Sequence, residues 1–329
     1  MTAAPAPEVP KLRWRGLIFA LFAFIVVSAM PVLGFYPPVK AWHLLLTTIL
    51  AACAVIGWIR GGSALTAIVW LAAALLLMFR SAPSGDAYFW LERGWILLVA
   101  GVFGLASVLG GDRPFFGRAL VTVLASFGLA LVVLGARQGS FERLQLIVSG
   151  EFVTRNQATL EQFDTGADEL VGAAANAPAL ARSLEETKER LRLAPQISSV
   201  LAPALLALQT LAALALGWAM FQRLSRVRIG PPLAPLREFR FNDQLVWGLA
   251  VGLTILLLPA FAEAQAVGLN LVVFFAMLYF VRGLGVLAWV TKGGLFVVLA
   301  VLFSLFPPAL GALGLSDTWL DWRSRAKAA

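Results

Sequence analysis

The sequence is poor in charge, cysteine and histidine, and each shortage excludes a class of protein or site. Only 13% of its 329 residues are charged, against about 25% in soluble globular proteins. Cys53 is the only cysteine, which excludes a disulfide within the chain and a zinc site built from cysteines. His43 is the only histidine, so no pair of histidines exists to hold a metal. We therefore expect neither a metal ion nor a cofactor.

The residue sets of common catalytic sites are absent as well. No glycine-rich loop is followed by Lys and Ser or Thr, the pattern that holds nucleotide phosphates. No Ser or Cys has a plausible histidine base nearby. His43 itself opens an apolar segment beside Trp42, where an interfacial residue is the first interpretation and a proton carrier the alternative. The chain is predicted not to be an enzyme.

Long apolar runs fill most of the chain. Hydrophobic residues make up 60% of it, and the mean hydropathy is +0.84. A helix that crosses a bilayer needs about 20 predominantly apolar residues. We therefore predict an all-α, polytopic transmembrane helix bundle of about eight to ten membrane segments. The predicted segments are 16–36, 42–59, 63–79, 94–110, 118–137, 197–221, 245–262 and 267–290, followed by a shorter pair at 294–306 and 308–322.

One polar stretch, residues 138–195, interrupts the apolar runs and holds half of the 18 acidic residues. Apolar residues recur in it at three- and four-residue spacing, which predicts two or three amphipathic helices in an extracytoplasmic insert. The insert is either a solvated helical cap on the bundle, or a docking surface or lid. The remaining parts are a cytoplasmic tail (1–15), a first transmembrane group (16–137), and a second group (196–329) with a cytoplasmic basic loop (222–243).

The arginines indicate how the chain is oriented. The net charge is +8, but the basic residues cluster in short loops between apolar runs, as cytoplasmic loops do, so we expect a lipid bilayer as partner and no nucleic acid. The tail ends in Lys11, Arg13 and Arg15 and shows no cleavable signal peptide, which predicts a multi-pass membrane protein with its N-terminus in the cytoplasm. Pro307 and Pro308 favour two short, broken helices that return the C-terminus to the cytoplasm, whereas a single span there would leave it outside.

A few polar residues inside the apolar runs are candidates for a site, because such groups usually face the bundle interior or water. Arg282 lies well inside the segment that starts near residue 267, and Asn270 lies about three turns before it. Asp317 and Asp321 are four residues apart and therefore share a helix face. We predict an ion pair between Arg282 and Asp317, with a structural clamp or an arginine that reaches the interface as alternatives.

Three stretches of the second half resemble the YybS-like family of uncharacterised bacterial integral membrane proteins, a domain of unknown function. The stretches are residues 231–241, residues 269–283 with Asn270, Tyr279 and Gly283, and residues 314–323. The resemblance covers about residues 197–325 and implies a multi-pass protein of the bacterial cell (inner) membrane. The family is characterised by its topology, and it is similar in outline to the substrate-binding membrane subunits of energy-coupling-factor vitamin transporters. No ligand residue is implied by that second similarity.

Two functions remain open. In the first, the protein is a transporter-like subunit that binds a small solute between helices, with the insert as an outer lid. Its candidate lining residues are Asn270, Tyr279, Arg282, Asp317 and Asp321. Such a subunit would need a cytoplasmic coupling protein, for which the candidate contacts are Arg223, Arg226, Arg228, Arg237 and Arg240. In the second, the protein is a membrane scaffold whose insert or basic loop recruits envelope proteins.

Overall fold

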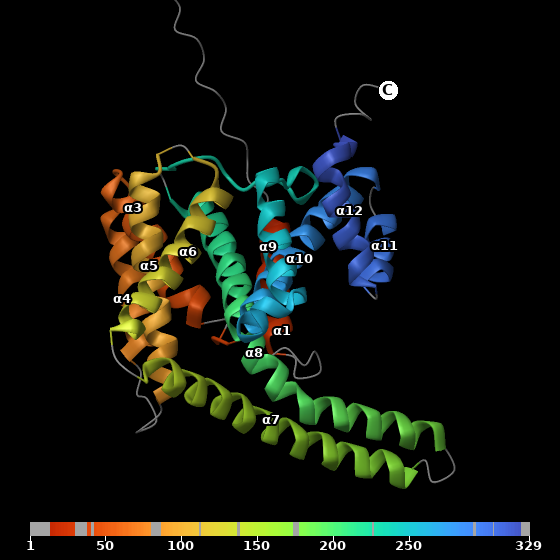
Figure 1. Ribbon diagram of the computed structural model, residues 1–329. Coiled ribbons are helices and arrows are strands. Elements are labelled where there is room, and N and C mark those ends of the chain that lie inside the picture. Colours follow the sequence, from red (N-terminus) through yellow and green to blue (C-terminus); the bar gives the residue numbers. More distant parts are fainter. Residues whose placement is uncertain are drawn as a thin grey trace, which may run out of the picture.

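A computed structural model describes residues 14–29, 38–40, 43–79, 87–111, 113–136, 139–173, 178–225, 227–291, 294–304 and 306–323. In these residues every regular element is a helix, which confirms the all-α prediction (Figure 1). The α-helices are α1 (Trp14–Ala29), α3 (Leu50–Ile59), α4 (Ala64–Phe79), α5 (Ala87–Leu109), α6 (Phe115–Gly135), α7 (Ser140–Ala173), α8 (Pro178–Leu224), α9 (Val246–Leu257), α10 (Gln265–Val290), α11 (Gly294–Ser304) and α12 (Pro307–Leu320). Four short helical turns are η2 (Leu44–Ile49), η3 (Leu236–Glu238), η4 (Asp243–Leu245) and η5 (Pro259–Ala264).

Within the described residues, four helical stretches are long and apolar enough to cross a membrane. They are Ala87–Leu109, Phe115–Gly135, Arg182–Leu224 and Pro259–Val290. A fifth candidate is the bent pair Leu295–Phe303 and Pro307–Leu320, whose two halves meet at 110°. This agrees with the predicted break at Pro307 and Pro308 and with a polytopic membrane protein. The predicted count of eight to ten segments is not confirmed.

The other predicted segments correspond to apolar helices of only 10–17 residues. A helix of 16 residues is about 24 Å long, and the hydrocarbon core of a bilayer is about 30 Å thick. Two sequence features explain the short lengths: Gly61, with φ of +93°, makes the turn between α3 and α4, and Pro259 begins a 3₁₀ turn after α9. Whether these helices cross the bilayer stays a prediction, and residues 30–36 of the first segment lie outside the described residues.

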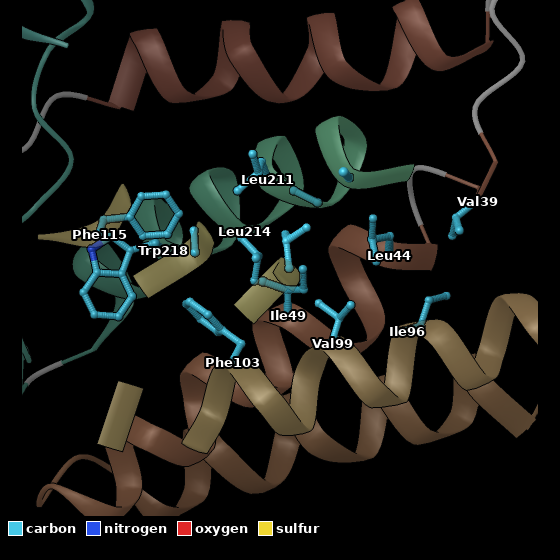
Figure 2. Packing of buried hydrophobic residues seen from close by; sticks show 14 of the residues in the cluster. Val39, Leu44, Ile49, Ile96, Val99, Phe103, Phe115, Leu211, Leu214 and Trp218 are labelled. Carbon is cyan, nitrogen blue, oxygen red and sulfur yellow. The ribbon is translucent and has the colours of Figure 1, made fainter. Parts of the chain in front are cut away.

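The core of the bundle lies between η2, α5 and α8 (Figure 2). Ile49, Val99 and Leu214 are completely or almost completely buried there. Trp218 of α8 meets Phe103 of α5 edge to face, with ring centroids 6.1 Å apart. Other helices of the bundle carry large exposed apolar side chains, such as Leu76 of α4, Val132 of α6 and Val298 of α11. An apolar exterior of this extent needs an apolar surrounding, which the hydrocarbon core of a bilayer supplies.

Two antiparallel helices project from the bundle and form what we call the arm, residues 140–173 and 178–195. Figure 1 shows the arm running crosswise to the bundle helices and extending beyond them. Lys188 of α8 and Asp164 of α7 join its two helices through an ion pair of 2.7 Å. At its base Phe152 is fully buried and packs in one cluster with Ala194 and Ala202. The predicted amphipathic helices of the insert are therefore present.

The arm and the bundle share one helix. α8 continues without a break through residue 195, where the sequence predicts the boundary between the insert and the second transmembrane group. Besides Pro178, where it begins, α8 contains Pro195 and Pro203 inside the helix. The arm is therefore connected to the bundle by continuous helix rather than by a linker.

The chain after α12 lies beside the basic loop. Arg323 donates hydrogen bonds to the carbonyl oxygens of Arg237 and Phe239, at 3.1 and 3.0 Å. Those carbonyls belong to the turn around η3, so the end of α12 and the basic loop share one end of the bundle, called here the loop end. This is the arrangement predicted for two broken helices at the C-terminus.

α10 and α12 approach each other with their backbones in contact. A Cβ atom added at Gly314 would overlap the carbonyl oxygen of Tyr279, and one added at Gly283 would overlap the carbonyl oxygen of Leu310. Glycine is the residue that permits such a crossing, as at many helix contacts in membranes. Gly311, one turn before Gly314 in α12, has nothing within 4 Å of its added Cβ.

We expect Gly314→Ala to destabilise the protein by about 1–3 kcal/mol, the usual range for overpacking a tight contact. The measurement is the midpoint of thermal unfolding in detergent, followed by size-exclusion chromatography of the heated samples. Gly311→Ala is the matched control, since it places the same methyl group in the same helix in open space. Equal midpoints for the two variants would contradict the close crossing.

Candidate functional site

Three segments bring six charged side chains together at the loop end. We call this group the ionic cluster. The basic loop supplies one arginine and one aspartate, α10 supplies one arginine, and α12 with the residues after it supplies two aspartates and one arginine. Its members are Arg240, Asp243, Arg282, Asp317, Asp321 and Arg323.

The predicted ion pair between Arg282 and Asp317 is the centre of this cluster. Arg282 Nε donates to Asp317 Oδ2 at 2.9 Å, and Nη2 donates to the backbone carbonyl of Asp317 at 3.2 Å. Nη1 donates to Asp243 Oδ1 at 2.7 Å. The side chains of Arg282 and Asp317 are only 2% and 0% exposed. Arg282 is therefore held inside the protein. The alternative, in which its side chain reaches the membrane interface and contacts water, does not agree with this burial.

Arg323 is a third member of the centre that sequence reasoning missed. Its Nη2 lies 2.6 Å from Asp317 Oδ2, so one carboxylate oxygen accepts from two arginines. Residues six apart do not share a helix face, which is why Asp317 and Arg323 gave no signal as a pair. The helix ends at Asp321, whose φ of 41° is left-handed, and this turn brings Arg323 back toward Asp317.

Asp321 pairs with Arg240 of the basic loop and not with Arg282. The sequence predicts Asp321 as a solute-lining residue and Arg240 as a contact for a cytoplasmic partner. In the structure the two charges compensate each other, with both side chains a little under half exposed. This pair forms the outer edge of the ionic cluster and ties the basic loop to the end of α12.

Tyr279 lies one turn before Arg282 on α10 and faces the same junction. Its ring is 1% exposed and packs edge to face on Phe241 of the basic loop, with centroids 5.2 Å apart. The guanidinium of Arg282 lies 5.3 Å from the centroid of the same Phe241 ring. Tyr279, Arg282 and Asp317 therefore do share one site, and the basic loop closes it.

Asn270 is remote from the ionic cluster, because the twelve residues to Arg282 span about 18 Å of helix. Its side chain forms hydrogen bonds with backbone groups of α8 beside Pro203. Asn270 Oδ1 accepts from the backbone nitrogen of Ala204 at 2.9 Å, and Nδ2 donates to the carbonyl of Val200 at 2.8 Å. Ala204 and Val200 would bond to each other in a regular helix, but Pro203 disrupts the ladder here. Asn270 inserts between them and satisfies both groups.

The four candidate partner-contact arginines that lie within the described residues differ in their contacts. Arg223 donates to the carbonyl of Ala219 at 2.7 Å, and Arg240 belongs to the ionic cluster. Arg228 is exposed, and Arg237 is exposed with its Nε 3.4 Å from Glu238. Arg226 lies outside the described residues.

A second polar cluster, at the arm end of the bundle, includes His43, for which the sequence favours an interfacial residue. Glu92 of α5 is 5% exposed, and its Oε1 accepts from the backbone nitrogen of Lys40 at 2.8 Å. His43 Nδ1 lies 3.5 Å from the same oxygen. Gln209 of α8 bonds to both backbone groups of Val39. Glu92 lies two residues before the predicted segment 94–110, so hydropathy did not mark it as a buried acidic residue.

This second cluster touches the arm. The guanidinium of Arg155, on α7, lies 5.0 Å from the ring centroid of Tyr88, on α5. The hydroxyl of Tyr88 donates to the carbonyl of Pro38, next to Val39 and Lys40. Arg155 is in turn paired with Glu151 at 2.7 Å. The base of the arm is therefore fixed to the bundle through α5 and residues 38–40.

Comparison with known proteins adds a family but no activity. A family model described as "Predicted membrane protein (DUF2232)" matches residues 17–318. No curated protein and no solved structure matches the chain. Among the described residues, no group of three His, Cys, Asp or Glu side chains could hold a metal ion.

We expect Asp317→Ala to lower stability by about 3–5 kcal/mol, because it leaves two buried arginines without their carboxylate. Asp321→Ala is the matched control, since it removes a carboxylate of the same helix end from a half-exposed pair worth about 0–1 kcal/mol. Thermal unfolding in detergent compares the two. A smaller loss for Asp317→Ala than for Asp321→Ala would show that the buried pair does not hold this end together.

For Asn270 we expect a rescue. Asn270→Leu removes the side-chain partner of the Val200 carbonyl and of the Ala204 N–H. Ala204 is buried, and its unsatisfied N–H costs about 1–3 kcal/mol. Adding Pro203→Ala restores an N–H and removes the ring, so that the two groups can bond to each other and stability should recover. The readout is again the unfolding midpoint. If the double variant is no more stable than Asn270→Leu, the bridging role is wrong.

Proposed function

The chain belongs to this family of predicted membrane proteins (DUF2232), and from that premise we propose that it is a membrane scaffold. The helical bundle anchors the protein in the bilayer, and the arm recruits a protein partner of the bacterial envelope. The basic loop lies at the opposite, cytoplasmic end. The observation that supports this proposal most is the arm itself, a long helical pair that extends beyond the bundle (Figure 1).

A continuous helix and side-chain contacts at its base fix the arm relative to the bundle. α8 contains 47 residues, which corresponds to about 70 Å of helix. A single helix therefore reaches from the arm to the loop end of the bundle. Phe152 and its neighbours pack the base of the arm, and Arg155 joins it to Tyr88 of α5. A rigid projection presents a partner surface without the entropic cost of ordering a loop on binding.

The surface of the arm suits a protein partner. Residues 138–195 carry six basic and nine acidic residues, a net charge of −3. On α8 the side chains of Glu185, Glu186, Glu189, Arg190 and Arg192 are exposed. Exposed charges of this kind steer association and select partners more than they add affinity. We expect the partner surface to be basic.

The contacts of the candidate lining residues favour the scaffold over a solute-binding subunit. Arg282, Asp317 and Asp321 are bonded to opposite charges of the same chain, and Asn270 is bonded to the backbone of α8. A cavity of about 70 Å³ lies between α3, α4 and α8, and none of these residues lines it. Small-molecule sites usually measure about 300–1,000 Å³. The solute-binding subunit stays the alternative.

Photo-crosslinking in living cells tests the scaffold. A photoreactive amino acid in place of Glu186 or Arg190, both exposed on the arm, should give a discrete crosslinked product with one partner protein. The matched control places it at Val132, which is 72% exposed on the outward face of α6 and should contact lipid. Products that are identical for the arm and for Val132 would contradict the proposal.

A second experiment separates the two functions. The Asn270→Leu, Pro203→Ala double variant keeps the fold but removes the candidate lining amide, so a scaffold should still give the crosslinked product in cells. A solute-binding subunit would instead lose uptake of its solute in this variant while losing nothing when the arm is shortened. That outcome would replace the scaffold by the alternative.

A further inference from the structure

The cavity between α3, α4 and α8 opens near the loop end, and neither the scaffold nor the ionic cluster uses it. It extends from the α3–α4 turn, at Gly62 and Ser63, inward along both helices. α8 closes its far side with the last residues of the helix. Its lining is Leu50, Cys53, Ala54, Gly57, Trp58, Gly62, Ser63, Thr66, Ala67, Trp70, Phe221, Leu224 and Ser225.

The lining of the cavity is polar at one end and apolar at the other. Toward the turn it contains the hydroxyl groups of Ser63, Thr66 and Ser225, whereas the inner part is formed by apolar side chains such as Leu50 and Phe221. The volume of about 70 Å³ admits a narrow chain rather than a whole solute of ordinary size. A ligand with a polar part outside and a slender apolar part inside matches this gradient.

Aromatic side chains place the mouth of the cavity at a membrane interface. Trp58 lines it and is 47% exposed, and Trp14 at the start of α1 is 45% exposed. The guanidinium of Arg223, next to the lining residue Leu224, lies 5.9 Å from the ring centroid of Trp14. Tryptophan is enriched at the level of the lipid headgroups. The hydroxyl end of the cavity is therefore at headgroup depth.

The charged residues that lie nearest in sequence to the cavity lining are all arginines, and one of them, Arg60, donates to the carbonyl of Val108 on α5 at 3.3 Å. Between residues 43 and 79, which contain α3 and α4, Arg60 is the only charged residue. Residues 222–235, which follow the cavity lining of α8, contain Arg223, Arg226 and Arg228 and no acidic residue. Arg60 and Arg228 are exposed. Basic groups between transmembrane helices at the cytoplasmic face are suited to anionic lipid headgroups.

We propose that this cavity is a binding site for an anionic phospholipid of the inner leaflet. Part of one acyl chain occupies the apolar inner part, the glycerol and ester oxygens face the hydroxyls of Ser63 and Thr66, and the phosphate lies near Arg60 and Arg228. The site would hold α3, α4 and the end of α8 together at the loop end. It does not depend on the scaffold function of the arm.

The test is lipid binding by the full-length protein in detergent, measured by native mass spectrometry during titration with phosphatidylglycerol or phosphatidylcholine. Phosphatidylglycerol should give a saturable adduct at lower concentration than phosphatidylcholine. An arginine near an anionic headgroup is worth about a fivefold change in affinity, so Arg60→Gln with Arg228→Gln should weaken phosphatidylglycerol binding about 30-fold. Arg237→Gln is the control, because it is an exposed arginine of the same loop outside this mouth.

A second pair of variants probes the cavity itself. Ala54→Leu fills the inner part and should abolish the saturable adduct, whereas Ala72→Leu adds the same volume at an exposed position of α4 that does not line the cavity. Equal occupancy by the two lipids, or unchanged binding in both the double arginine variant and Ala54→Leu, would overturn the proposal. The proposal would also be overturned if inorganic phosphate alone shifted the unfolding midpoint as much as phosphatidylglycerol does, since the site would then bind a free anion.

Discussion

The carboxylate of Asp317 accepts hydrogen bonds from Arg282 and Arg323, and this shared contact determines where α10, α12 and the basic loop meet. A buried charge is costly unless it is paired and hydrogen-bonded, so none of the three segments can move away alone. Arg323 also bonds to the backbone of the basic loop, and Arg282 to Asp243 within it. The same pairing that neutralises Asp317 thus closes the loop end of the bundle.

A related constraint acts on the backbone of α8. In an apolar surrounding each broken backbone hydrogen bond must find a new partner, and Pro203 breaks one about midway along this long helix. Asn270 supplies both a donor and an acceptor at the break. α8 can therefore bend toward the arm while its polar backbone remains satisfied. Asn270 and the ionic cluster both supply partners to polar groups in an apolar surrounding. Asn270 does so for backbone groups, and the ionic cluster does so for charged side chains.

These contacts change how the polar residues of the bundle are interpreted. Rare polar groups inside apolar helices often mark a transport pathway, but here they hold helices and loops in place. The arm, by contrast, carries exposed charged side chains on α8, such as Glu186 and Arg190. α8 runs through both the arm and the bundle, which is the basis for proposing that the arm recruits a partner.

The sequence by itself determined the class of the protein, the helical insert and the pair of Arg282 with Asp317. Each follows from a local pattern: apolar runs, helical spacing, and a charge that needs a partner in a membrane. Only the tertiary structure decided that Arg323 joins this pair, that Asn270 bridges Val200 and Ala204, and that Glu92 binds the backbone at Lys40. Hydropathy and periodicity show which face of a helix is apolar, but they do not identify the neighbouring helix. Contacts between residues far apart in the chain depend on that choice of neighbour.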